Sequence, residues 1–245
     1  MMGQSPTRKD TVLHGNLYQS APEQAWQELR ELADRVEQRL RHVVEVIDAK
    51  KTPHGLAVTE GHLSLNPRNL NALLTEWISG VYHARSMNTY QRHGARVKIA
   101  TCADFHGNRW TSNALLMQIP GKVSYLLPAG AVMRLFKRHN GRQAIAVKSA
   151  PPSLDIAASR TDDKFFLHVA NTEFSRSIEA SFAVQDFTAT GGRVLAIAPE
   201  SLRQNVNENN PRAVMPREHA LPPADVFRWR FPAGSVSVVE LDCRA

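Results

Sequence analysis

The sequence predicts a protein in two parts, an α/β segment at residues 1–142 followed by an all-β segment at residues 143–245. The first part alternates helical patterns with short apolar runs, which is the order of elements in parallel β/α units. The second part has short apolar segments separated by turn residues and no helical period, which is typical of an antiparallel β-sandwich. With 245 residues, of which 42% are hydrophobic, the chain is long enough for both parts to be folded.

A long helix is predicted from Ser20 to about Asp48. Ser20 and Glu23 have the spacing of a capping box, in which each side chain accepts a hydrogen bond from a backbone amide at the helix start. Apolar residues then recur every three or four positions, and they are Trp26, Leu29, Ala33, Val36, Leu40, Val43 and Ile47. This stripe has two interpretations, a helix packed on a sheet and a short coiled coil that pairs two chains.

Two buried strands and two further helices follow. The strands are predicted at Leu56–Thr59, which ends at Glu60, and at Val97–Ala103, which ends at Asp104. The helix between them is expected from Pro67 to about His93, and a third helix from Pro128 to Arg138. The inner face of the middle helix is expected to contain Leu70, Leu73, Leu74, Trp77, Ile78 and Val81.

The first part contains too few strands for a complete parallel barrel. A (β/α)8 barrel has eight strands and about 250 residues of its own, whereas this part supplies two clear strands and three helices. We therefore expect the last units of an incomplete barrel, followed by the sandwich. The sandwich strands are predicted at Leu154–Ala158, Phe165–Ala170, Ile178–Val184, Val194–Ala198, Val226–Phe231 and Val236–Leu241.

Several segments occur in an order that is found in one enzyme family. They are Leu56–Glu60, Ala72–Leu74, Arg92–Ala100, Pro128–Gly141, Asn171, Asn207–Pro216 and Phe231–Val236. Together they resemble the C-terminal part of the family 51 glycoside hydrolases, the retaining α-L-arabinofuranosidases, which have a β/α barrel followed by a β-sandwich. The resemblance covers about three quarters of the chain.

The resemblance implies a catalytic role for Glu60, as the nucleophile at the end of the seventh barrel strand. It gives no residue for the acid/base glutamate, which in the family lies on the fourth strand. This sequence also departs from the family pattern Asp-Glu-Trp-Asn around the nucleophile, because it has Thr59, Glu60, Gly61 and His62. The resemblance thus implies the C-terminal portion of a retaining glycosidase for L-arabinose-containing poly- or oligosaccharides, inactive by itself.

Retaining glycoside hydrolysis requires two carboxyl groups about 5 Å apart. Since neighbouring strands lie about 4.8 Å apart, Asp104 is the second carboxylate that strand order places near Glu60, although a strand-end aspartate is more commonly a loop cap. We expect His62, Asp104 and Trp110 to contact the sugar. His62 and His106 also form a His/carboxylate set with Glu60 and Asp104, but without a close ligand pair we expect no metal and no cofactor.

Composition and charge also bear on nucleic-acid binding, membrane insertion, export and disulfide bonding. The formal net charge is +7, and this surplus is spread along the chain. The local basic cluster of Arg134, Lys137, Arg138, His139 and Arg142 lacks the pattern of interleaved aromatics of a nucleic-acid module, so we expect no nucleic-acid partner. No run of about 18 apolar residues predicts a membrane span, and residues 1–10 lack the apolar core of a secretory signal. Cys102 and Cys243 are expected to be unlinked thiols, and we expect a cytoplasmic location unless a separate N-terminal half carries an export signal.

The expected partners are a carbohydrate substrate and a polypeptide that covers the open edge of the parallel sheet. That polypeptide is either the missing half of the barrel or a second copy of the chain. The competing functional class is a non-catalytic carbohydrate-binding or interaction module. A monodisperse monomer in solution would argue against both forms of edge covering.

Overall fold

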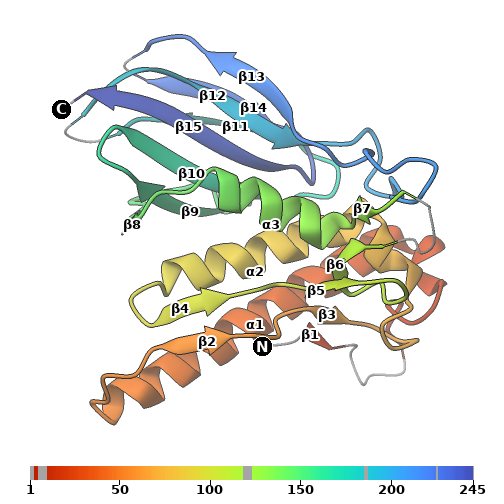
Figure 1. The fold of residues 1–245 in the computed structure, drawn as a ribbon. Helices are drawn as coiled ribbons and strands as arrows, with labels where there is room; N and C mark the ends of the chain where they lie inside the picture. The colour runs from red at the N-terminus through yellow and green to blue at the C-terminus, as the bar shows by residue number, and fades with distance from the viewer. Residues whose placement is uncertain (1–2, 5–9, 118–122, 185–186, 225, 245) are drawn as a thin grey trace.

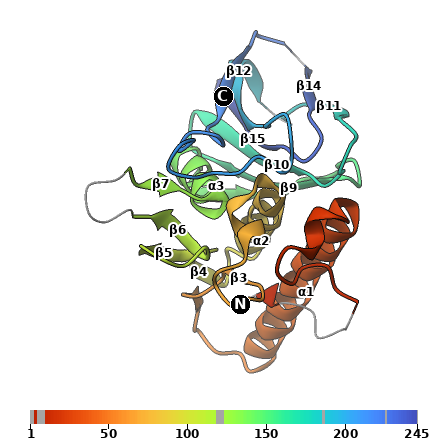
Figure 2. The same cartoon turned by 90° about the vertical axis from the view of Figure 1, so that its right-hand side faces the viewer.

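The computed structural model describes residues 3–4, 10–117, 123–184, 187–224 and 226–244. Within these ranges the chain forms layers (Figure 1). A six-stranded antiparallel sheet lies on one side of two helices, α2 (Gly80–Arg92) and α3 (Pro128–Arg138), and short strands lie on the other side. The view in Figure 2 shows the longest helix, α1 (Pro22–Ala49), lying beside α2 on the side away from β5 and β6.

Helix α1 ends within one residue of the predicted position, but its start differs from the prediction. Ala21 is the N-cap residue, and none of the side chains that the structure describes caps the helix. The Ser20 hydroxyl instead donates to the carbonyl of Leu17 (2.9 Å), where it closes the 3-10 helix η1 (Leu17–Gln19), so the predicted capping box is wrong. The apolar stripe packs on α2 of the same chain, and Trp26 Nε1 donates to the carbonyl of Thr172.

The second predicted helix is wrong in its first half. Residues 67–70 form a turn, and two 3-10 helices, η2 (Ala72–Thr75) and η3 (Trp77–Ser79), precede α2. Asn71 caps η2 by accepting from the amide of Leu73. Long-range bonds fix this segment, because the backbone amide of Trp77 donates to Gln204 and its indole nitrogen donates to Gly234. Leu70, expected to face inward, is 48% exposed.

Strands β2, β4 and β5 lie below α2 and α3 in Figure 1. Strands β2 and β4 pair in parallel, as predicted from the order of elements. However, β4 ends at Ala100, and Asp104 begins a new strand that pairs in parallel with β6, so the predicted strand Val97–Ala103 is too long. Ile99 of β4, expected to be buried, is 64% exposed. The strands of this region are β1 (Gly3–Gln4), β2 (Leu56–Val58), β3 (Leu63–Ser64), β4 (Val97–Ala100), β5 (Asp104–Gly107), β6 (Asn113–Leu116) and β7 (Tyr125–Leu126).

The all-β part contains two sheets that face each other across a core, a sandwich-like arrangement. The larger sheet has the order β13-β12-β15-β10-β9-β8, and β11 pairs with β14 in the smaller one. All six predicted strands are present, whereas β8 and β13 were not predicted. The strands are β8 (Gln143–Ile145), β9 (Leu154–Arg160), β10 (Lys164–Asn171), β11 (Ile178–Phe182), β12 (Thr188–Ile197), β13 (Arg217–Leu221), β14 (Phe227–Phe231) and β15 (Val236–Arg244).

The central strands of the six-stranded sheet are buried on both faces. Phe166 and Val238 belong to the core shared with the helices, whereas their neighbours Phe165 and Val239 belong to the core shared with β11 and β14. This division follows the alternation of side chains along a strand. Because the first of these cores contains residues from both predicted parts, the β2–β4 region is attached to the sheet through packed helices.

Two further sequence-based expectations concern the cysteines and the membrane. Cys102 and Cys243 are both buried free thiols, as expected. None of the helices in the described part of the chain has the length and apolar character needed to span a bilayer.

Candidate functional site

Glu60 lies two residues after β2, at the edge where β2 and β4 end. The parallel pairing continues past the strand ends, since the amide of Thr101 donates to the carbonyl of Val58 (3.0 Å). The Glu60 side chain is 58% exposed, so its carboxylate can be reached from solvent.

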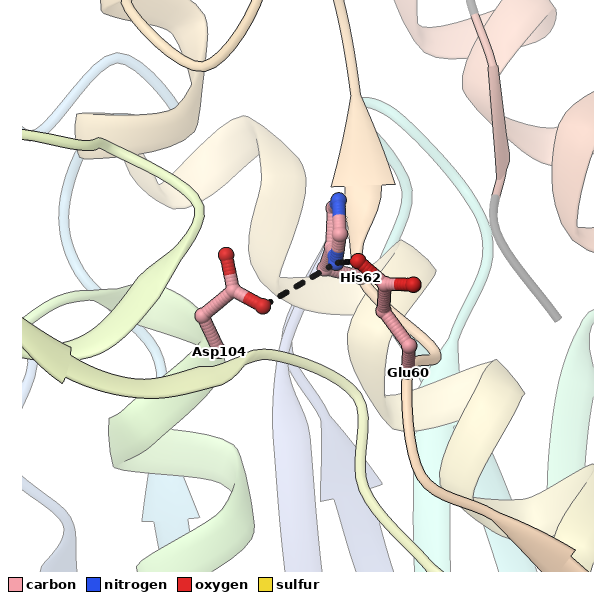
Figure 3. A group of neighbouring side chains, drawn as sticks. All are labelled: Glu60, His62 and Asp104. Carbon is pink, nitrogen blue, oxygen red and sulfur yellow. Dashed lines mark ion pairs between the residues drawn. The ribbon is translucent and has the colours of Figure 1, made fainter.

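His62 lies between two carboxylates (Figure 3). Its Nδ1 atom is 3.5 Å from Oδ1 of Asp104 and 3.9 Å from Oε1 of Glu60. The His62 side chain is only 5% exposed, whereas Asp104 is 28% exposed. Ser112 Oγ donates to the other oxygen of Asp104 (3.0 Å), which turns Oδ1 toward the imidazole. One ligand atom from each of Glu60, His62 and Asp104 lies within 4.8 Å of the others, so these three residues are the candidate metal or substrate ligands.

Gly61 allows Glu60 and His62 to occupy these positions. A Cβ atom at residue 61 would overlap the carbonyl oxygen of Thr101 and would approach the hydroxyl of Tyr90. The backbone between Glu60 and His62 therefore packs directly on the chain that follows β4. An aromatic side chain, which the resemblance would place at residue 61, does not fit this backbone.

A second histidine, His83 of α2, lies within electrostatic range of His62. It is 3% exposed, and burial together with the charge of His62 lowers its pKa to about 3. A hydrogen bond to the backbone at Cys102 acts in the opposite direction. His83 is therefore neutral at physiological pH and adds no positive charge behind the cluster.

The structure brings three of the four predicted site residues together and leaves the fourth outside the cluster. Trp110 lies in the loop between β5 and β6, is 44% exposed, and its carbonyl accepts from the side chain of Asn113. His106, the other histidine of the metal alternative, is an exposed residue of β5 outside the cluster. Trp77 is fully buried, as predicted.

Two residues of the site were not predicted. Ser112, which holds Asp104, and His83, which lies behind His62, belong to segments without a chemical motif. Strand β5 pairs in parallel with β6, and this pairing places Asp104 opposite Asn113. A prediction of that pairing would have indicated that Ser112, the residue before Asn113, lies near Asp104.

Similar folds occur among solved glycosidase structures. The α-L-arabinofuranosidase from Thermotoga maritima, in an arabinose complex, gives a TM-score of 0.75 at 19% identity over 89% of this chain and 50% of that chain. The thermostable family 51 enzyme from Thermotoga petrophila gives 0.74 at 18% identity, over 86% of this chain and 49% of that chain. The enzyme from Xanthomonas axonopodis pv. citri gives 0.72 at 18% identity, over 90% and 48%.

These likenesses show a shared fold, and the chain spans about half the length of the three enzymes. A family model, the α-L-arabinofuranosidase C-terminal domain, matches residues 56–235. Because that match covers most of the chain, the chain belongs to the α-L-arabinofuranosidase C-terminal domain family. A search of curated proteins gives no match.

Proposed function

We propose that this chain supplies the nucleophile and the β-sandwich of a retaining glycoside hydrolase that cleaves L-arabinose-containing poly- or oligosaccharides. The observation that carries the proposal is the position of Glu60, an exposed carboxylate at the end of a strand in a parallel pair. Membership of the α-L-arabinofuranosidase C-terminal domain family supports the substrate class.

In such a reaction the Glu60 carboxylate attacks the anomeric carbon, and the bond from that carbon to the leaving oxygen breaks. The leaving oxygen keeps the electron pair of that bond and takes a proton from a second carboxyl group. Water then gives a proton back to that group and attacks the anomeric carbon, and the bond from this carbon to Glu60 breaks, which releases the carboxylate. Under this proposal His62, Asp104 and Trp110 contact the sugar.

Asp104 has a carboxylate oxygen within 4.8 Å of one of Glu60, but its surroundings do not suit the second carboxyl group. The two carboxyl groups must flank the scissile bond, whereas His62 lies between Glu60 and Asp104. One oxygen of Asp104 faces that imidazole and the other accepts from Ser112. We therefore assign Asp104 to positioning His62, and we infer that the acid comes from a polypeptide outside these 245 residues, which would also cover the β2–β4 edge.

The proposal predicts no turnover by the isolated chain. Hydrolysis of an aryl α-L-arabinofuranoside with a poor leaving group should not exceed that of the Glu60→Gln variant, because no acid protonates the leaving oxygen. Hydrolysis that is lost in Asp104→Asn but retained in His106→Asn would instead make Asp104 the acid and would contradict the inference that the acid comes from outside these 245 residues.

The second candidate function is a carbohydrate-binding module without catalysis. Two exposed aromatic side chains favour it, Phe105 of β5 (77% exposed) and Trp110 of the following loop (44% exposed). Exposed aromatic rings can stack on the apolar faces of sugars. Such a module would bind sugar without forming a covalent bond at Glu60.

A further inference from the structure

A buried ring nitrogen of His62 has no hydrogen-bond partner among the residues that the structure describes. The His62 side chain is 5% exposed, and no donor or acceptor in those residues meets its Nδ1 with hydrogen-bond geometry. Buried polar atoms are normally satisfied. This atom points instead into the space between the carboxylates of Glu60 and Asp104 (Figure 3).

We propose that Glu60, His62 and Asp104 bind one divalent transition-metal ion, with zinc as the best match. The inference goes beyond the proposed glycosidase function and does not depend on it. An ion in this space would give the orphaned Nδ1 a partner and would join it to both carboxylates.

The spacing of the three donor atoms fits an ion of this size. Two ligands each about 2.1 Å from a zinc ion, at a tetrahedral angle, are about 3.4 Å apart. The observed separations from Nδ1 are 3.5 Å to Asp104 and 3.9 Å to Glu60. Since Glu60 is the most exposed of the three residues, rotation of its side chain can close the remaining gap.

The chemical types of the three donor groups also favour a transition-metal ion such as zinc. One imidazole and two carboxylates suit zinc and neighbouring transition metals better than calcium or magnesium, which prefer oxygen ligands alone. The buried free thiol of Cys102 is not a member of this three-residue cluster. Ser112 provides the outer hydrogen bond that usually orients a metal-binding carboxylate.

Metal binding and glycoside cleavage would compete for Glu60. A Glu60 oxygen that coordinates the ion is not available to attack a sugar. The ion would therefore inhibit the glycosidase reaction, and chelator-treated protein is the form in which Glu60 acts as a nucleophile.

Calorimetric titration of the chelator-treated 245-residue chain with ZnCl₂ tests the proposal. We expect saturable binding of one ion per chain. His62→Asn and Asp104→Asn should each weaken binding at least about tenfold, while the matched control His106→Asn should leave it unchanged. Co²⁺ should give visible absorption bands of a low-symmetry site in the wild type and not in His62→Asn.

Absence of one-site binding, or equal affinity in His62→Asn, Asp104→Asn and His106→Asn, would overturn the proposal. Circular dichroism of the metal-free variants checks their folding. Asp104→Asn keeps the test decisive if His62→Asn does not fold, because Asp104 is partly exposed and keeps its Ser112 contact. Since these measurements contain no sugar, their failure leaves the nucleophile role of Glu60 unaffected.

Discussion

At the scale of single residues, Gly61 determines how Glu60 and His62 are presented. Replacement by alanine places a methyl group against the carbonyl of Thr101 and the hydroxyl of Tyr90. The nearest atom is a backbone oxygen, which cannot move away as easily as the end of a side chain. Overpacking of this kind typically costs about 1–3 kcal/mol. We expect Gly61→Ala to lower the free energy of unfolding by about 2 kcal/mol, measured by urea denaturation.

The control for this prediction is Thr59→Ala, a change at an exposed neighbouring position. It should change the free energy of unfolding by less than about 0.5 kcal/mol. Equal stability of Gly61→Ala and wild type would show that the backbone at residue 61 does not pack on Thr101 as described.

The sequence allowed part of the site to be predicted at this scale. Glu60 and Asp104 were expected to lie close together at the ends of two parallel strands. Their ligand atoms do lie within 4.8 Å, although Asp104 begins β5 and does not end β4. The contact of His62 with both carboxylates was not predictable from spacing. It depends on the close approach of Gly61 to Thr101, which is a tertiary contact.

At the scale of elements, His168 joins β10 to α2 and α3. Its Nε2 donates to the carbonyl of His139 (2.6 Å), its Nδ1 lies 2.9 Å from the side-chain amide of Gln91, and its ring stacks on Phe136. Burial is the main reason that its pKa is lowered to about 4, and the charge of His139 adds to the effect. The folded protein therefore holds His168 neutral.

A lowered histidine pKa predicts that acid destabilises the fold. Between pH 6.5 and 4 the unfolded chain binds a proton at His168 that the folded chain does not, so the free energy of unfolding falls as pH falls. By pH 4 the loss from this group reaches about 3 kcal/mol. His168→Gln should show a shallower decrease in urea denaturation between pH 7 and pH 4.5.

His54→Gln, at an exposed position, serves as the matched control and should keep the wild-type pH dependence. Identical pH dependence of His168→Gln and wild type would contradict the neutral, buried state of His168. His83, whose pKa is also lowered, contributes in the same direction in all three proteins.

Elements were predicted best where local signals determine them. Helix α3 has the predicted bounds because proline at its start and a basic last turn agree with its apolar stripe. The region before α2 was predicted as helix because its apolar spacing is helical. Its 3-10 structure results from hydrogen bonds of Trp77 to Gln204 and Gly234, residues more than 120 positions away, which no local pattern reveals.

At the scale of the whole molecule, the two predicted parts share a core. The six-stranded sheet has apolar residues at successive positions, such as Phe165 and Phe166, because one face contacts the helices and the other contacts the small sheet. The sequence predicted the strands but not this double burial. It follows that the sandwich holds α2, and through α2 the β2–β4 pair that positions Glu60.

The chain spans about half of the arabinofuranosidases that share its fold. We propose that Glu60 is the nucleophile of a retaining glycosidase whose acid lies outside these 245 residues. A glycoside with an activated leaving group tests the nucleophile separately from the acid. A dinitrophenolate leaves without a proton, so attack on its glycoside requires only the nucleophile.

The most direct measurement is covalent labelling of the chelator-treated chain with a dinitrophenyl 2-fluoro-α-L-arabinofuranoside, followed by peptide mass spectrometry. We expect at most one equivalent of dinitrophenolate, with the fluoro-sugar attached to Glu60. Asp104→Asn should still be labelled and Glu60→Gln should not. No label on the wild type, or a label at another residue that persists in Glu60→Gln, would contradict the claim and favour the binding module.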